Sequence, residues 1–458
     1  MVLYLAAIVS YLGIFASSTF MGWSSPVLPL YERDDSPFHL TGSEGAWVAS
    51  LNLLGAAVGP PVCLLFAHSV GRKTLLIFSV LPFVIGCITI ALATSVYHLY
   101  FARFISGMGT GTAICVMPMY LGEISPPHRR GSLLAFIIMS SRLGILFAYA
   151  VYPFVSIAVG ALVSMILPLV YVLSFIFLPE SPYHWVRKGK RDAAAKSLVR
   201  LRGTKDIQEE LDRIETSVKA EMANSGGFRE LLFVPGNRTS LFVSVILGMI
   251  QQLSGSQAIM LYAQNIFDAA HVAVAGKYMA IILGVVQLFF TGVCGFLVDY
   301  FGRRPLLLSS TVGSLVSTAI IAAYFHLKAM EFDTSHIEWL PATGCMLYVV
   351  FYSLGLAPLP TAMTGELFPT NTKSLGCATA VFCTYIVGFG VGKVYQIICD
   401  SVGTHVGFWI FAGCNVIGII YIYLFVPETK GKTLQEIQED LNRRKSVISM
   451  KNSEWVAG

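Results

Sequence analysis

Val70-Gly71-Arg72-Lys73 recurs in the second half of the chain as Phe301-Gly302-Arg303-Arg304. Two further motifs recur in the same order: Tyr120-Leu121-Gly122-Glu123-Ile124-Ser125-Pro126 with Gly365-Glu366-Leu367-Phe368-Pro369, and Pro179-Glu180-Ser181-Pro182 with Pro427-Glu428-Thr429-Lys430. Recurrence in the same order across the chain indicates an internal repeat. Repeated membrane halves are typical of proteins that expose one central site alternately to the two sides of a bilayer. We therefore expect two halves of similar fold around a central site.

Composition assigns the chain to membrane proteins. Of its 458 residues 55% are hydrophobic and 12% are charged, and the mean hydropathy is +0.68. Soluble domains contain about 25% charged residues. We predict an all-α membrane protein with twelve transmembrane helices in two pseudo-symmetric six-helix halves, joined by a helical cytoplasmic linker. The predicted spans, at roughly 20 residues each, are 4–23, 45–66, 74–94, 98–118, 132–152, 156–178, 239–262, 277–298, 305–326, 340–363, 374–397 and 405–426.

The spans divide the chain into four parts: a first half at 1–178, a cytoplasmic loop at 179–238, a second half at 239–426 and a tail at 427–458. The loop is predicted to be largely helical. Ile207, Leu211, Ile214 and Val218 recur at helical spacing and form one apolar face. A shorter helix is expected at 190–201, and 221–230 reads as a charged, solvated segment. We expect the loop helices to lie under the bundle and tie the halves together.

Charge distribution predicts the orientation. With the N-terminus inside, the cytoplasmic loops and tail contain 25 of the 31 Lys and Arg residues, so the positive-inside rule places both termini in the cytoplasm. The first span has no Lys or Arg before it and no clear cleavage site, so we expect it to be retained. A multi-pass protein of the plasma membrane is the resulting expectation.

The sequence offers no pattern for a metal, a cofactor or covalent catalysis. Nine scattered cysteines have no metal-like spacing and read as small buried hydrophobes. There is no phosphate-binding loop, so nothing supports ATP as a drive. We expect no enzyme activity and no nucleic-acid partner. The expected partners are a small-molecule sugar and the lipid bilayer, and the oligomeric state is left open.

The chain resembles the sugar-porter (glucose transporter) family of the major facilitator superfamily along nearly its whole length. The matching residues are Gly71-Arg72-Lys73, Ala102-Arg103-Phe104, 120–131, 179–182, Gln251-Gln252-Leu253-Ser254-Gly255, Asp299 with Gly302-Arg303-Arg304, 365–369 and 427–431. Within that family it is most similar to the insect facilitated trehalose transporters, through Gly22-Trp23-Ser24-Ser25-Pro26 and Lys393.

The resemblance implies that charged residues at the inner helix ends act as a gate. They would close the inner side when the outer side is open and separate when it closes. The expected gating residues are Arg72, Lys73, Arg103, Glu123, Arg129, Arg130, Glu180, Asp299, Arg303, Arg304, Glu366, Lys373 and Glu428. A network spanning both halves would bias two conformations, although a single exposed ion pair contributes only about 0–1 kcal/mol. Topology and solubility explain the basic residues equally well, but not the matched carboxylates.

Two gate positions depart from the family pattern. His68 stands where the family has an acid, and Lys373 stands where it has Arg. The charged gate residues of the first half then interact either more weakly, or in a way that depends on pH through His68. A neutral loop histidine is the other reading. The ammonium of Lys373 is a point charge, whereas the guanidinium of Arg can make two parallel hydrogen bonds to a carboxylate.

Substrate contacts are expected near the middle of the membrane, where amides can donate to and accept from sugar hydroxyls. The resemblance assigns this role to Gln251 and Gln252, with Gln257 and Gln287 in place of two family asparagines. Gly255 is expected to unwind the helix between the amides. Thr361 replaces a family Trp and would widen the cavity, and Ile138 replaces a family Gln. Hydrogen bonding between helices is the alternative role for such amides.

Two cations lie inside predicted spans, Arg142 in the fifth and Lys393 in the eleventh. Because an unpaired charge is costly in a bilayer, each should face the central cavity or an internal partner. Substrate contact and a structural bond to backbone carbonyls are equally open at this point. Arg103 is expected to support packing or gating.

These observations predict a facilitative sugar transporter, a uniporter that works by alternating access on a hexose or a disaccharide such as trehalose. Uniport is favoured because the first span contains no Asp, Glu or His to bind a coupling proton. One rival is a non-transporting sugar sensor of the same fold. The other is a porter of a polyol or of an anionic solute bound by Arg142 and Lys393.

Overall fold

The computed structural model describes residues 2–31, 36, 38–223, 227–269, 274–369, 371–432 and 436. Within these residues the chain is helical, and twelve helical segments are long and apolar enough to cross a membrane, as predicted. Residues 224–226, within the segment predicted to be charged and solvated, and almost all of the tail beyond 432 lie outside the described residues.

The first half contains six of these segments. They are α1 (Val2–Gly22), α3 with α4 (Gly42–Ala57, Gly59–Phe66), α5 with α6 (Arg72–Phe78, Val80–Ala91), α7 (Val96–Ile124), α8 (Pro127–Val151) and α9 (Ile157–Phe175). Short helical pieces α2 (Ser24–Val27), η1 (Leu28–Leu30) and η2 (Tyr152–Phe154) lie at the ends of α1 and α8.

The second half contains the other six. They are α14 (Pro235–Gln251) continuing through the π-helix η3 (Gln252–Ser256) into α15 (Gln257–Ala269), then α16 (Gly276–Phe301), α17 (Arg303–Ala329), α18 with α19 (Leu340–Leu354, Leu359–Leu367), α20 (Lys373–Ser401) and α21 (Thr404–Phe425). The 3-10 turn η4 (Ser335–Ile337) precedes α18. The break predicted at Gly255 is present, and the structure adds breaks at residues 355–358, at Val58 and at Ser79.

The linker is helical, with α10 (Pro182–Arg187), α11 (Arg191–Arg202), α12 (Gln208–Ala223) and α13 (Phe228–Phe233). Its predicted apolar face is buried against α11: Leu211, Ile214 and Val218 pack with Leu198. The helices α10 and α11 pack on the first half, whereas α13 packs on α14 and α20. The linker is thus divided between the halves, and residues 224–226 between its two parts are not described.

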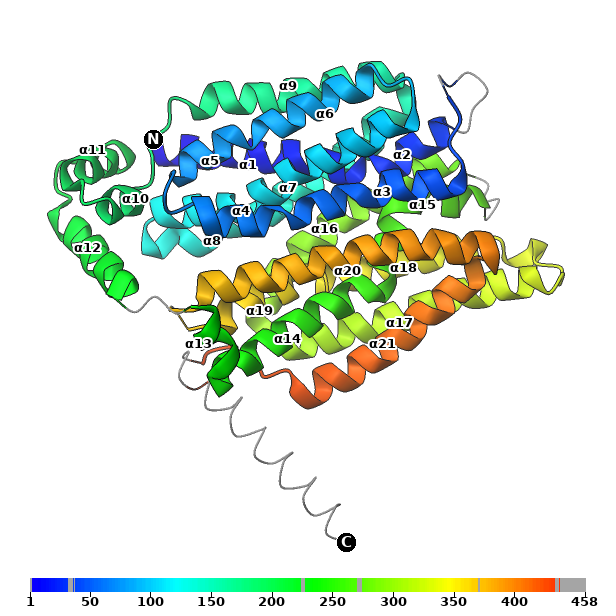
Figure 1. Cartoon of the computed structure of the whole chain (residues 1–458). Helices are drawn as coiled ribbons and strands as arrows, with labels where there is room; N and C mark the ends of the chain where they lie inside the picture. Colours follow the sequence, from blue (N-terminus) through cyan, green and yellow to red (C-terminus); the bar gives the residue numbers. More distant parts are fainter. Residues whose placement is uncertain are drawn as a thin grey trace, which may run out of the picture.

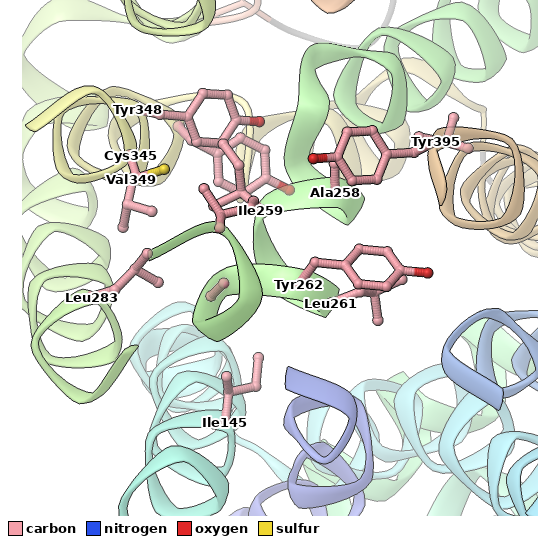
Figure 2. Close-up of a cluster of buried hydrophobic side chains, with 14 of the residues drawn as sticks. Ile145, Ala258, Ile259, Leu261, Tyr262, Leu283, Cys345, Tyr348, Val349 and Tyr395 are labelled. Atoms are coloured by element: carbon pink, nitrogen blue, oxygen red, sulfur yellow. The ribbon is translucent and has the colours of Figure 1, made fainter. Parts of the chain in front are cut away.

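Figure 1 shows the two halves side by side, with α10–α13 gathered at one end of the bundle. We call this the linker end and the other the opposite end. The halves meet mainly through α3 against α20 and α8 against α16. Beside the π-helix, a buried cluster packs Leu261 and Tyr262 of α15 near Tyr395 of α20 and Ile145 of the first half (Figure 2).

Small residues permit the closest helix approach in the first half. A Cβ atom at Gly111 would lie 2.0 Å from the Ala56 carbonyl oxygen, and one at Gly107 would lie 2.2 Å from the Asn52 carbonyl oxygen. Glycines four apart let two membrane helices pack backbone to backbone. This packing of α3 on α7 brings Asn52 and Arg103 to the inner wall of the first half.

Candidate functional site

A cavity of about 220 Å³ lies between the two halves and is lined by both. Its wall is made of apolar side chains and of polar ones that are mostly neutral. The polar lining residues are Asn52, Arg103, Arg142, Tyr149, Ser244, Gln251, Gln252, Ser256, Gln257, Tyr352, Thr361, Thr364, Thr384 and Tyr385. We call this the central cavity. Three of the four predicted amides and Thr361 belong to its wall.

The π-helix brings Gln252 and Gln257 together. Gly255 has φ +103°, a left-handed conformation that side chains rarely adopt, so the regular helix is interrupted there as predicted. The Nε2 atom of Gln257 donates to Oε1 of Gln252 at 2.7 Å. No residue in the described part of the chain bonds the other two polar atoms, Gln252 Nε2 and Gln257 Oε1. The pair therefore offers a free amide nitrogen, which donates, and a free amide oxygen, which accepts, to a solute.

Gln251 has a different role in this conformation. Its Nε2 atom donates to the carbonyl oxygens of Leu356 and Ala357 at 2.8 and 2.9 Å. These carbonyls belong to the break between α18 and α19, where they lack partners within a helix. Gln251 thus holds the break in place through a hydrogen bond between helices, which is the alternative role expected for these amides.

Gln287 does not line the cavity. Its side chain is fully buried on α16, and Nε2 lies 3.7 Å from the sulfur of Met260, a residue that does line the cavity. The expected substrate contact is therefore not made by Gln287 in this conformation. The rotation of α16 about its axis decides whether this position faces the cavity or packs behind its wall, and sequence spacing could not resolve it.

Arg103 is a packing residue of the first half. Its guanidinium donates to the Val48 carbonyl at 3.2 Å, to the Phe20 carbonyl at 2.7 Å and to the Ser24 hydroxyl at 3.0 Å, and it stacks 4.9 Å above the Trp23 ring. These partners come from α1, α2 and α3. Of the two roles expected for Arg103, these contacts support packing.

The two other intramembrane cations are separated. Arg142 lines the central cavity, whereas Lys393 lies outside its lining. The Lys393 ammonium donates to the Ser43 carbonyl at 2.9 Å and to the Ser43 hydroxyl at 3.1 Å, and it lies 4.8 Å from the centre of the Trp47 ring. Because Ser43 and Trp47 belong to the first half, Lys393 joins the halves near the opposite end.

The repeated motifs form the same cluster twice at the linker end. In the first half, Arg72 pairs with Glu123 at 2.9 Å, and Glu180 accepts from the Lys73 amide at 3.1 Å. In the second half, Arg303 pairs with Glu366 at 3.0 Å, and Glu428 accepts from the Arg303 and Arg304 amides at 3.0 Å. Hydroxyls complete the match: Ser181 donates to Glu123 and Thr429 to Glu366.

Each cluster places a carboxylate at a helix N-terminus. Glu180 lies at the start of α5 and Glu428 at the start of α17, where free amides and the helix dipole favour negative charge. The glycines before these helices are required: a Cβ atom would lie 2.5 Å from Glu180 Oε2 at Gly71 and 2.8 Å from Glu428 Oε2 at Gly302. Burial alone would raise the pKa of Glu428, but amide donors from Lys430, Arg303, Arg304 and Thr429 outweigh it and hold the pKa low.

The expected network between the halves is not formed in this conformation. Within the described residues, Arg129, Arg130, Asp299 and Lys373 are exposed and make no ion pair, although Arg129 lies 5.5 Å from the centre of the Tyr4 ring. Hydrogen bonds that join the halves lie toward the opposite end, at Tyr149–Met260 (2.9 Å), Ser25–Gln264 (3.2 Å) and Ser43–Lys393. These hydrogen bonds hold the halves together toward the opposite end, whereas the linker-end clusters are internal to each half.

His68 takes part in the first cluster as a neutral group. Its Nδ1 atom lies 3.2 Å from Nη2 of the always-charged Arg72, so the ring accepts a hydrogen bond there. Burial, together with the charges of Arg72 and Arg187, lowers the pKa of His68 to about 4. The neutral reading of His68 therefore fits the structure, and a switch near neutral pH does not.

Comparison with known proteins assigns the family. Residues 6–441 match the family described as "Sugar (and other) transporter". The chain belongs to this family. It is 30% identical over 433 residues to the "Facilitated trehalose transporter Tret1-2 homolog" of Drosophila simulans, covering 94% of this chain and 89% of the relative. It is 31% identical over 458 residues to the "Facilitated trehalose transporter Tret1" of Culex quinquefasciatus, covering 98% and 88%.

Solved structures agree on the fold. The xylose transporter XylE from E. coli, in a partially occluded inward open conformation, matches with a TM-score of 0.80 at 21% identity, covering 94% of this chain and 100% of that one. The chain is therefore a multi-pass membrane protein of the major facilitator fold.

The sequence indicates most of the amides in the cavity wall but not its hydroxyl groups. These include Ser244, Thr364 and Thr384. Their only signal in the sequence is that small polar residues recur within apolar spans.

Proposed function

We propose that this protein is a facilitative sugar transporter that works by alternating access. The observation that carries the proposal is the central cavity: both halves line it, and its second-half wall presents neutral amides and hydroxyls. Amides and hydroxyls both donate and accept, which suits a solute whose polar groups are hydroxyls. A cavity shared by two halves opens to one side or the other when the halves rock.

We assign the linker end to the cytoplasm, on the charge distribution of the loops, and the protein to the plasma membrane. The conformation described above is then closed to the outside. Release of the Lys393–Ser43 contact would open the outer side, and closure of the linker end would bring Arg129 or Arg130 toward Asp299. These residues, with the two clusters, form the proposed gate.

The proposed substrate is a hexose or a disaccharide such as trehalose, the solute in the names of the two insect relatives. The direct test is an uptake panel of glucose, fructose, trehalose and inositol in cells that lack their own carriers. Saturable uptake of one of the first three supports the proposal. Uptake of inositol alone would make it a polyol porter, and sugar binding without uptake would make it a sensor.

We further propose uniport. Helix α1 contains no Asp, Glu or His, so this segment offers no carboxylate or imidazole to carry a coupling proton. Sugar uptake should therefore not acidify the interior, and a protonophore should leave it unchanged. Acidification that tracks sugar entry would show that protons are cotransported.

A further inference from the structure

Arg142 is a cation in the central cavity without a partner in the protein. It lies on α8, it is only partly exposed, and its Nε atom is buried without a hydrogen-bond partner. Among the described residues, no side chain or carbonyl makes a hydrogen bond or ion pair with its guanidinium. The ionisable groups that interact with it electrostatically are the phenols of Tyr352 and Tyr149, which carry no negative charge at neutral pH.

Arg103 shows what a satisfied arginine looks like in the same wall. Three protein oxygens and the Trp23 ring surround its guanidinium, so its role is complete without a solute. Arg142 has no such set. A buried charge is retained only when something compensates it, and the protein supplies nothing comparable here.

The described lining of the cavity contains no Asp and no Glu. The wall therefore contains no negative charge to balance Arg103 and Arg142. Lys393, the other cation that the sequence suggests for an anionic solute, instead contacts Ser43 near the opposite end. One guanidinium remains for a solute. It lies on the first-half wall, whereas Gln252 and Gln257 lie on the second-half wall.

We propose that the preferred solute is a sugar acid, whose carboxylate binds Arg142 while its hydroxyls bind Gln252 and Gln257. This rests on the proposed function and specifies its substrate class. The planar guanidinium matches a carboxylate with two parallel hydrogen bonds. A single free cation balances one negative charge, which favours a carboxylate over a phosphate monoester carrying about −1.5 to −2. A solute held by both halves also links its recognition to their movement.

The test uses the purified full-length protein in proteoliposomes, with counterflow of labelled D-glucose as the readout. D-glucuronate should inhibit at a roughly tenfold lower concentration than its uncharged analogue D-glucuronamide, since the two differ by the charge on one group. D-glucose 6-phosphate should inhibit no better than D-glucuronate. Equal inhibition by glucuronate and glucuronamide overturns the proposal without any variant being needed.

Variants then locate the effect. Arg142→Gln should weaken inhibition by glucuronate roughly tenfold and bring it to the level of inhibition by glucuronamide, since the variant removes the group that distinguishes the two inhibitors. Arg142→Lys keeps the positive charge but cannot make two parallel hydrogen bonds. Its inhibition by glucuronate should lie between that of the wild type and that of Arg142→Gln. Unchanged glucuronate inhibition in a folded Arg142→Gln protein would also overturn the proposal. Glucose counterflow that glucuronate does not inhibit rejects the sugar acid alone, whereas failure of every sugar to exchange rejects the proposed function.

Discussion

Gln252 is the residue whose side chain the proposed sugar contact depends on most. Its amide faces the cavity and shares one hydrogen bond with Gln257. Gln252→Ala removes a donor for the sugar and leaves Gln257 without its acceptor. Because a neutral hydrogen bond contributes about 0.5–1.5 kcal/mol, the transport KM should rise roughly two- to tenfold with surface expression unchanged.

The matched control is Gln396→Ala. Gln396 is also an amide on a membrane helix, but it bonds Asp400 and lies outside the cavity lining. Its removal should leave the KM for sugar unchanged. Equal effects of the two substitutions would mean that Gln252 acts through general helix packing and not through the solute.

His68 gives a prediction for pH. Its ordinary pKa of about 6.5 falls to about 4 in the folded protein, so between these values the unfolded chain binds more protons than the native state. The stability contributed by neutral His68 is therefore full above pH 6.5 and is lost as pH falls from 6.5 toward 4. The Tm of the wild type and the Tm of His68→Gln should differ by a constant amount above pH 6.5. Below pH 6.5 the Tm of the wild type should fall relative to that of the variant. A difference that changes between pH 7 and 8 would contradict this.

Residue identity predicted some of these roles and not others. Gly255 indicates a local break, so the amides on either side of it could be assigned to one site, but the bond between Gln252 and Gln257 is seen only in the structure. The roles of Gln287 and Lys393 could not be predicted, because each depends on how a helix is rotated about its axis. The sequence shows that these side chains are inside a span but not which neighbour they meet.

The π-helix is the element on which the amide geometry rests. Gly255→Ala forces a side chain into φ +103°, and its Cβ atom would lie 3.1 Å from the Phe411 ring. Strain of about 1–3 kcal/mol should regularise the turn and separate Gln252 from Gln257. Sugar affinity should fall at least severalfold, measured as the KM of uptake.

Gly413→Ala is the control for this element, because a Cβ atom there would meet nothing within 4 Å. It should transport like the wild type. Full activity of Gly255→Ala would show that the π-helix is not needed to present the amides. The breaks at Val58 and Ser79 contain no left-handed residue. Prolines follow both, Pro60 and Pro61 after the first and Pro82 after the second, and these are the sequence signals for the two breaks.

At the scale of the whole molecule, the contact between Ser43 and Lys393 must break for the opposite end to open, since the two residues belong to different halves. Cysteines at both positions, in a chain whose nine native cysteines are replaced, should be joined by a short bifunctional thiol reagent. The joined protein should lose transport, and each single cysteine variant should keep it. Full transport by the joined protein would rule out opening at this place.

The repeat predicts two similar halves, and these are present, whereas the charged motifs form one cluster within each half in place of the expected network between the halves. It does not predict whether the clusters join, because that depends on which of two conformations is populated. Arg129, Arg130, Asp299 and Lys373 are unpaired in the described structure, and a sequence that serves two conformations specifies partners for both.

The most direct measurement for an alternating-access sugar carrier is counterflow in proteoliposomes of the purified protein. Vesicles loaded with unlabelled sugar and diluted into a trace of the same labelled sugar should accumulate label transiently above equilibrium. That overshoot requires a site that returns loaded from one side to the other. Entry of label only to equilibrium, or no entry by protein that binds the sugar, would contradict the account.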